Sequence, residues 1–204
     1  MSSIHRAVAM VFVFCGVIVA VTSLTTHTAQ AEQHTAKAPN LVGVISAANA
    51  HDTVYIDGYH RVSDVVINKP LVLIGRQAVI DAEERGGSVL TVRSDSVEIR
   101  DITVKNVRVD YTEDNAAIKL DAVRHVVVAS CHIDNGFFGI YLSRSRDCTI
   151  SDNILTSKQR DESSSGNGIH LWTSVNVRIT GNHCEGWRDG IYFEFVHQGT
   201  VQNN

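Results

Sequence analysis

Apolar and polar residues alternate over short stretches of this chain, and the same stretches return at regular intervals. Residues 168–171 (GIHL) return 22 positions later as residues 190–193 (GIYF), and residues 139–142 (GIYL) precede them by 29 positions. Alternation with a period of two is the pattern of a half-buried β-strand. A phrase that returns at a fixed spacing indicates an internal repeat, which has to be recognised before any single element is assigned.

A second phrase keeps the same spacing. Residues 179–182 (ITGN) have counterparts at 128–131, 150–153 and 201–204, separated by steps of 22, 29 and 22 positions. Each unit is too short to hold a helical crossover, so equivalent strands of successive units must stack in parallel. The sequence therefore predicts an all-β fold, a right-handed parallel β-helix with coils of about 22 residues. The 7 extra residues of the longer step fall in a polar stretch, 158–166 (KQRDESSSG), and a similar insertion lies at 107–115.

Alternation also predicts which side chains face the interior of the coil. Ile140, Ile169 and Ile191 should stack in one interior column. The positions between them face outward, and they form two ladders along the stacked strands. The ladders are Lys119, Tyr141, His170, Tyr192 and Asp121, Ser143, Trp172, Glu194. Asn153, Asn182 and Asn204 share one register with Cys131, which predicts an inward stack of asparagines that bond from coil to coil.

The two ends of the chain differ from the repeats. Arg6 precedes an apolar run at 7–21 and a small-x-small site that ends at Ala31. This pattern predicts a cleaved signal peptide over 1–31 and a periplasmic location. Residues 32–40 are expected to form a polar leader. The chain stops at Asn204 within a repeat phrase, so we expect the incomplete β-helix domain, 41–204, to continue in further coils.

The N-terminal part of the domain is less regular. Apolar spacing at 41–50 (LVGVISAANA) predicts a short helix that caps the first coil. Asp57-Gly58 is expected to form a turn. The strands expected before the regular coils lie at 53–56, 71–74, 79–81, 89–92, 97–102 and 107–109.

Charge and cysteine content exclude some classes of function. The chain has a net charge of −4 and no cluster of Lys or Arg, so binding to nucleic acid is not expected. Cys131, Cys148 and Cys184 occupy different positions of the coil and should be too far apart for a disulfide. We therefore expect three free thiols.

Three stretches of the chain resemble a specific family. Residues 167–172 (NGIHLW) and 188–194 (RDGIYFE), together with 52–58 (DTVYIDG), resemble the NosD family of periplasmic maturation proteins for nitrous oxide reductase. The chain departs from the family pattern at His51, where a glycine is usual, and it is shorter than family members. The resemblance implies work beside an ABC transporter ATPase and permease, with nitrous oxide reductase and a copper chaperone as further partners. By this resemblance, the protein would help to complete the copper–sulfide centre of the reductase.

The same resemblance raises the question of bound copper. Cu(I) prefers thiolate, thioether and imidazole ligands. His132 and His183 share a register but lie two coils apart, about 9.6 Å, and Cys184 points to the opposite face from its neighbour His183. These three residues are the metal candidates, and their placement predicts no tight Cu(I) site. A docking scaffold for a separate copper donor fits the sequence better.

Partner docking and enzyme activity both remain open at this point. The docking candidates are Tyr141, His170, Trp172, Arg188, Asp189, Tyr192 and Glu194, because exposed aromatic and charged side chains suit protein contacts. Arg188 and Asp189 could equally form a salt bridge at a corner of the coil. The alternative is a secreted β-helix enzyme that acts on acidic polysaccharide as a lyase, epimerase or glycoside hydrolase. The chain lacks the Asp-Pro-His and Gly-His-Gly motifs of such enzymes. A purely structural β-helix is a third reading.

Overall fold

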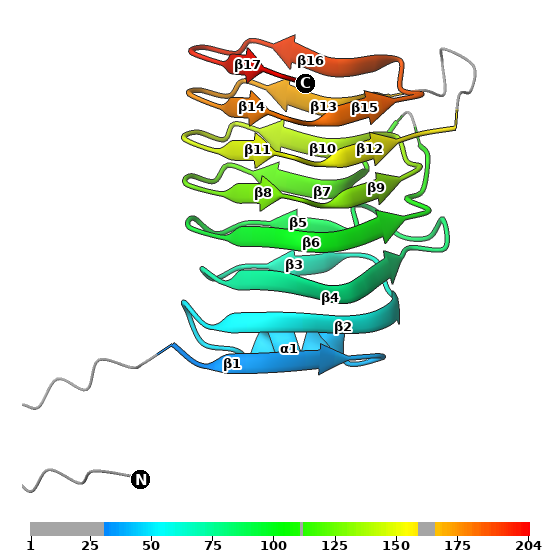
Figure 1. The fold of residues 1–204 in the computed structure, drawn as a ribbon, viewed down its shortest axis with the longest axis vertical. Helices are drawn as coiled ribbons and strands as arrows, with labels where there is room; N and C mark the ends of the chain where they lie inside the picture. Colours follow the sequence, from blue (N-terminus) through cyan, green and yellow to red (C-terminus); the bar gives the residue numbers. More distant parts are fainter. Residues whose placement is uncertain (1–30, 111, 159–165) are drawn as a thin grey trace, which may run out of the picture. The chain divides into compact units, whose positions relative to one another are not determined.

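The computed structural model describes residues 31–110, 112–158 and 166–204. The predicted signal peptide falls almost wholly outside these residues, and so does most of the insertion predicted at 158–166. The described part of the domain is a solenoid whose coils stack one above another (Figure 1). Every strand pairing in it is parallel. The predicted right-handed parallel β-helix is confirmed.

The chain contributes one short helix and a long series of strands. The elements of the first half are β1 (Gln33–Lys37), α1 (Leu41–Ala47), β2 (Thr53–Arg61), β3 (Val65–Ile67), β4 (Val72–Asp81), β5 (Leu90–Val92), β6 (Glu98–Lys105) and β7 (Ala116–Asp121). Those of the second half are β8 (Val127–Ala129), β9 (His132–Asp134), β10 (Phe138–Ser143), β11 (Thr149–Ser151), β12 (Ile154–Thr156), β13 (Asn167–Trp172), β14 (Arg178–Thr180), β15 (His183–Glu185), β16 (Asp189–Glu194) and β17 (Thr200–Gln202).

These strands form two sheets along the stack. The larger sheet follows the order β1-β2-β4-β6-β8-β11-β14-β17, and β9, β12 and β15 extend it around a corner. The smaller sheet follows the order β16-β13-β10-β7-β5-β3. Long strands β2, β4 and β6 each span the corner that the later coils break into two short strands, since β6 pairs with both β8 and β9. This is why the early coils look less regular in the sequence.

Strand register follows the spacing of the sequence. Ile150 pairs with Val128 on one side and with Ile179 on the other, and Ile179 pairs with Val201. On the smaller sheet, Ile169 pairs with Ile140 and Ile191. Both Ile140 and Ile169 are fully buried, and Ile191 packs against the same core. The predicted interior column is therefore confirmed.

One corner of the coil carries the stacked amides predicted from the sequence, and we call Cys131, Asn153, Asn182 and Asn204 the Asn corner. The backbone N–H of Cys131 donates to Oδ1 of Asn153 at 2.9 Å, and Nδ2 of Asn153 donates to Oδ1 of Asn182 at 2.8 Å. The amide of Asn182 continues the chain to Asn204, also at 2.8 Å. Each side chain bonds the coil beside it, so the inward stack of asparagines is confirmed.

The structure corrects several predictions made from the sequence for the first half of the domain. Part of the expected polar leader forms strand β1, which pairs with β2, so the sheet begins before residue 41. The expected turn at Asp57-Gly58 is wrong, because β2 runs through it with a bulge in its register to β4. Residues 107–109 form no strand; they begin the loop between β6 and β7. The capping helix is confirmed but ends at Ala47.

The three cysteines of the described residues form no disulfide with one another. Cys131, Cys148 and Cys184 are all free, as predicted. Burial raises the pKa of Cys131 to about 12 and those of Cys148 and Cys184 to about 11, so these thiols stay protonated at neutral pH.

In the part of the chain that the structure describes, no helix is both long and apolar enough to cross a bilayer.

Candidate functional site

The candidate docking residues lie on the outer face of the smaller sheet. We call the outward side chains of β7, β10, β13 and β16 the outer wall. Its central column pairs Lys119, Tyr141, His170 and Tyr192 in that order, and its neighbouring column pairs Asp121, Ser143, Trp172 and Glu194. Both ladders predicted from the alternation are confirmed in register.

The exposure of this wall differs from the expectation. Tyr141 and His170 point outward, but they are only 6% and 8% exposed, so their description as exposed docking residues is wrong. The Phe138 ring packs on both, with ring centroids 5.2 Å from Tyr141 and 4.7 Å from His170. Alternation shows on which face a side chain lies but not what covers it. Here an aromatic neighbour on the same wall supplies the cover.

His170 is held in a defined hydrogen-bond network. Nη2 of Arg188 donates to Oδ1 of Asn167 at 3.2 Å, which orients that amide. Nδ2 of Asn167 then lies 2.8 Å from Nδ1 of His170 and donates to it. This arrangement needs a neutral imidazole with its proton on Nε2, the atom that faces Glu194 at 3.7 Å. Burial keeps the pKa of His170 below its usual range, although the Glu194 carboxylate pulls the other way.

Trp172 and Tyr192 continue the wall on the last two described strands of the smaller sheet. The Tyr192 ring lies 5.2 Å from the His170 ring between centroids, and its 40% exposure goes with its place on β16, the last described strand of that sheet. Trp172 is half-buried, with the Arg144 guanidinium 6.0 Å from its ring centroid. Arg188 is exposed and forms a salt bridge to Asp189 at 3.1 Å, the corner contact that the sequence offered as an alternative to docking. Trp172, Tyr192 and Arg188 together form an aromatic and cationic surface.

Two pairs of carboxylates on this wall are spaced poorly for hydrolysis of a glycosidic bond. Such hydrolysis usually needs two carboxyl groups about 5–10 Å apart. Asp121 and Glu194 share a column, but Ser143 and Trp172 separate them, so they lie three coils or about 14 Å apart. Asp189 and Glu194 stand five residues apart on one strand, about 16 Å. Neither pair has the spacing for an acid and a base on one sugar ring.

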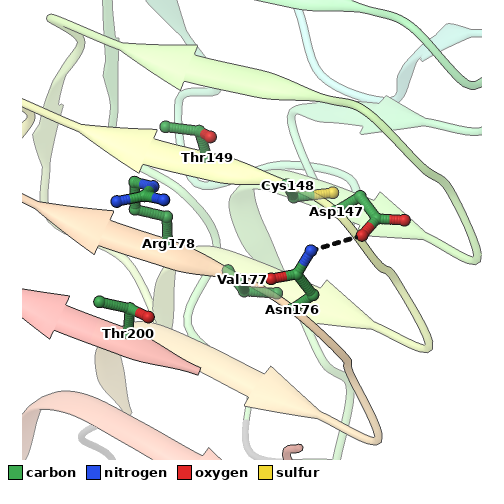
Figure 2. A pocket seen from close by; sticks show the side chains of 7 residues that line it. All are labelled: Asp147, Cys148, Thr149, Asn176, Val177, Arg178 and Thr200. Carbon is green, nitrogen blue, oxygen red and sulfur yellow. Dashed lines mark hydrogen bonds between the residues drawn. The ribbon is translucent and has the colours of Figure 1, made fainter. Parts of the chain in front are cut away.

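A polar pocket lies on the larger sheet, beside β11, β14 and β17 (Figure 2). Arg178 pairs with Thr149 and Thr200 on the flanking strands, and Asn176 donates to Asp147 at 2.6 Å. Cys148 also lines the pocket, but its thiol stays protonated because of its burial. The lining holds one carboxylate and no histidine, so it offers neither a carboxylate pair nor an activated nucleophile.

The three metal candidates do not come together. His132 and His183 both pair with Ile154, one on each side, so the two imidazoles lie about 9.6 Å apart in the stack. Cys184 faces the interior, where its Sγ approaches the backbone of Gly168. His183 faces solvent and lies 3.5 Å from Glu185. The donor set that copper would require is therefore split between the two faces of the coil.

Sequence reasoning missed other residues that shape these surfaces. Phe138 and Asn167 occupy the same outward column, next to glycines that interrupt the alternation, and this interruption hid them. At the other end of the solenoid, Glu32, His34 and Asp52 bring metal-binding atoms within 4.8 Å of one another. The early position of Glu32 and His34, in an expected leader, gave no signal for this cluster.

Comparisons with known proteins agree with this geometry. The family model of the right-handed β-helix region matches residues 44–161 and 116–204. A probable ABC transporter binding protein NosD from Pseudomonas aeruginosa is 29% identical over 130 residues, which are 61% of this chain and 30% of that protein. Its namesake from Stutzerimonas stutzeri is 28% identical over 115 residues, 55% of this chain and 26% of that protein. The chain thus spans less than a third of the length of these relatives.

A solved structure gives the same fold. The catalytic domain of a GH87 alpha-1,3-glucanase variant, in complex with tetrasaccharides, superposes with a TM-score of 0.64. The match covers 78% of this chain and 30% of that chain at 16% identity, which supports a shared fold alone. Family match, strand register and coil spacing agree: this chain belongs to the right-handed β-helix family, and its sequence is similar to NosD.

Proposed function

We propose that this chain is an exported accessory protein that docks partners while nitrous oxide reductase receives its copper–sulfide centre. The similarity to two proteins named as ABC transporter binding proteins carries the proposal. The proposal includes cleavage after Ala31 and a periplasmic location, as the first 31 residues of the sequence predict. The partners are the reductase, the ATPase and permease of an ABC transporter, and a copper chaperone.

The structure supports a scaffold more than a copper carrier. His132, His183 and Cys184 are split between two faces, and burial keeps the Cys184 thiol protonated. Trp172, Tyr192 and Arg188, by contrast, present large side chains on one face. Aromatic and arginine side chains dominate protein interfaces and typically cost about 2 kcal/mol or more when truncated. We place the docking surface on this part of the outer wall.

The test replaces Trp172, Tyr192 and Arg188 with alanine, singly and together, in the full-length protein. Copper content and activity of the reductase, purified from cells that carry each variant, are the measurements. We expect Trp172→Ala to fold normally by circular dichroism and to lower copper loading at least about tenfold, the ratio that corresponds to 1.4 kcal/mol of lost binding. Ile154→Ala is the matched control, because Ile154 is 47% exposed on the larger sheet.

Two outcomes would redirect the proposal. Normal copper loading with all three residues replaced would place docking on another surface. Turnover of a polyuronate by the purified protein, lost in Trp172→Ala, would favour the polysaccharide enzyme, the second candidate function. Stacked aromatic side chains such as Tyr192 suit sugar rings as well as proteins, and the polyuronate assay separates the two.

A further inference from the structure

Three side chains with metal-binding atoms meet where the first strand of the solenoid begins. Glu32 and His34 flank the start of β1, and Asp52 directly precedes β2, which pairs with β1 in parallel. One ligand atom from each side chain lies within 4.8 Å of the others. Nε2 of His34 and Oδ2 of Asp52 are 2.7 Å apart. The stacking of one coil on the next thus joins residues that are 18 and 20 positions apart in the sequence.

The central carboxylate of this cluster is held rigidly. Asp52 is only 1% exposed. The backbone N–H of Glu32 donates to its Oδ1 at 2.7 Å, and the backbone N–H of Asn49 donates to its Oδ2 at 2.8 Å. Both carboxylate oxygens are therefore fixed in position by backbone donors from two segments of the chain.

The side chains around this carboxylate include one basic group in the described residues, His34, and no Lys or Arg forms an ion pair with it there. Asp81, by comparison, has Lys105 at 3.6 Å, and Asp121 has Arg144 at 2.8 Å. Buried charges in proteins are paired or coordinate a metal ion. The convergence of an imidazole and a second carboxylate on buried Asp52 indicates that this position takes a cation.

We propose that Glu32, His34 and Asp52 bind one Zn²⁺ ion and that this ion fixes the first strand onto the solenoid. One imidazole and two carboxylates match the nitrogen and oxygen ligands of zinc. The set contains no sulfur, so it does not suit Cu(I). Ligand atoms at about 2.0–2.2 Å from zinc stand roughly 3–3.5 Å apart. Opening the contact between His34 and Asp52 to that distance needs only a small shift of β1.

Two features of β1 make the site usable. β1 is the edge strand of the larger sheet, so among the described strands it pairs with β2 alone. His34 keeps 26% of its side-chain surface exposed, and Glu32 is exposed, which gives an ion a route to the buried carboxylate. Cleavage after Ala31, as the sequence predicts, would turn the nitrogen of Glu32, 2.7 Å from Oδ1 of Asp52, into an α-amino group. That group pairs with Asp52 when it is charged and can ligate zinc once it has lost a proton.

The experiment titrates Zn²⁺ alone into the full-length protein as it is secreted, with its N-terminus defined by mass spectrometry. Calorimetry should show one saturable site per chain. His34→Gln should abolish it, and Glu32→Gln should weaken binding at least about tenfold, in line with the loss expected for metal-site residues. His183→Gln is the matched control, because His183 and Glu185 form a second His–acid pair two residues apart, fully on the surface. That variant should bind Zn²⁺ normally.

Thermal unfolding provides an independent measurement. An ion at 100 times its dissociation constant should raise the melting temperature by roughly 5–10 °C. His34→Gln, at a partly exposed edge position, is expected to fold and to lose this rise. Zn²⁺ uptake that is unchanged in His34→Gln, or the absence of saturable binding in the wild-type protein, would overturn the proposal. Neither readout involves the reductase, so the zinc site and the docking function stand or fall separately.

Discussion

The Asn corner and the outer wall are made by the same repeat but end in different chemistry. At the Asn corner, the amides of Asn153 and Asn182 bond to the neighbouring coil and are almost fully buried. Along the outer wall, Phe138 covers Tyr141 and His170, whereas Trp172 stays half-buried. A corner that satisfies its own polar groups serves the fold. A wall that keeps part of a large aromatic side chain exposed has surface left for a partner.

We expect the largest loss of stability from a substitution in the interior that both regions share. Ile169→Ala should lower the free energy of unfolding by about 2–5 kcal/mol, because the residue is fully buried between two coils. Urea denaturation followed by circular dichroism measures it. Val66→Ala, at an exposed position of the same sheet, should cost less than half as much. Equal costs at the two positions would contradict the interior position of Ile169.

A substitution in the Asn corner should lower the free energy of unfolding by a somewhat smaller amount. Asn153→Ala should cost about 2–4 kcal/mol, because it leaves the backbone N–H of Cys131 and the carbonyl of Val128 buried without partners. Asn68→Ala is the control, because this side chain is exposed and lies outside the stack, and it should lower the free energy of unfolding by less than about 1 kcal/mol. A near-neutral Asn153→Ala in urea denaturation would show that the corner adds little to the fold.

In the outer wall, we expect His170 to make the stability of the fold depend on pH. The pKa of His170 is lowered in the folded state from 6.5, because burial disfavours the imidazolium. The unfolded chain therefore binds more protons, and stability decreases as the pH falls through about 6.5 toward the lower folded value. His170→Gln keeps an acceptor for Asn167 and should flatten this decrease between pH 7 and pH 5 in thermal melts. His183→Gln, at an exposed position outside the wall, is the control variant; a flattened profile there would assign the effect to another group.

The sequence alone determined the repeat and nearly all that follows from its period. Alternation and the spacing of 22 and 29 residues predicted the stacked columns of Ile140, Ile169 and Ile191 and the inward asparagines. Both are consequences of local geometry: strand residues alternate between faces, and equal coils place equal positions above one another. The free cysteines followed from the same register.

Tertiary structure decided what covers each face and which distant residues meet. Phe138 lies over Tyr141 and His170 because its ring turns back along the wall, a packing choice that no alternation encodes. Strand β1 joins the sheet because its backbone groups find partners in β2, although its sequence is polar. That pairing carries His34 to the buried carboxylate of Asp52. Periodicity is a property of neighbouring residues, whereas burial and convergence depend on how separate coils pack, and only the folded chain brings those coils together.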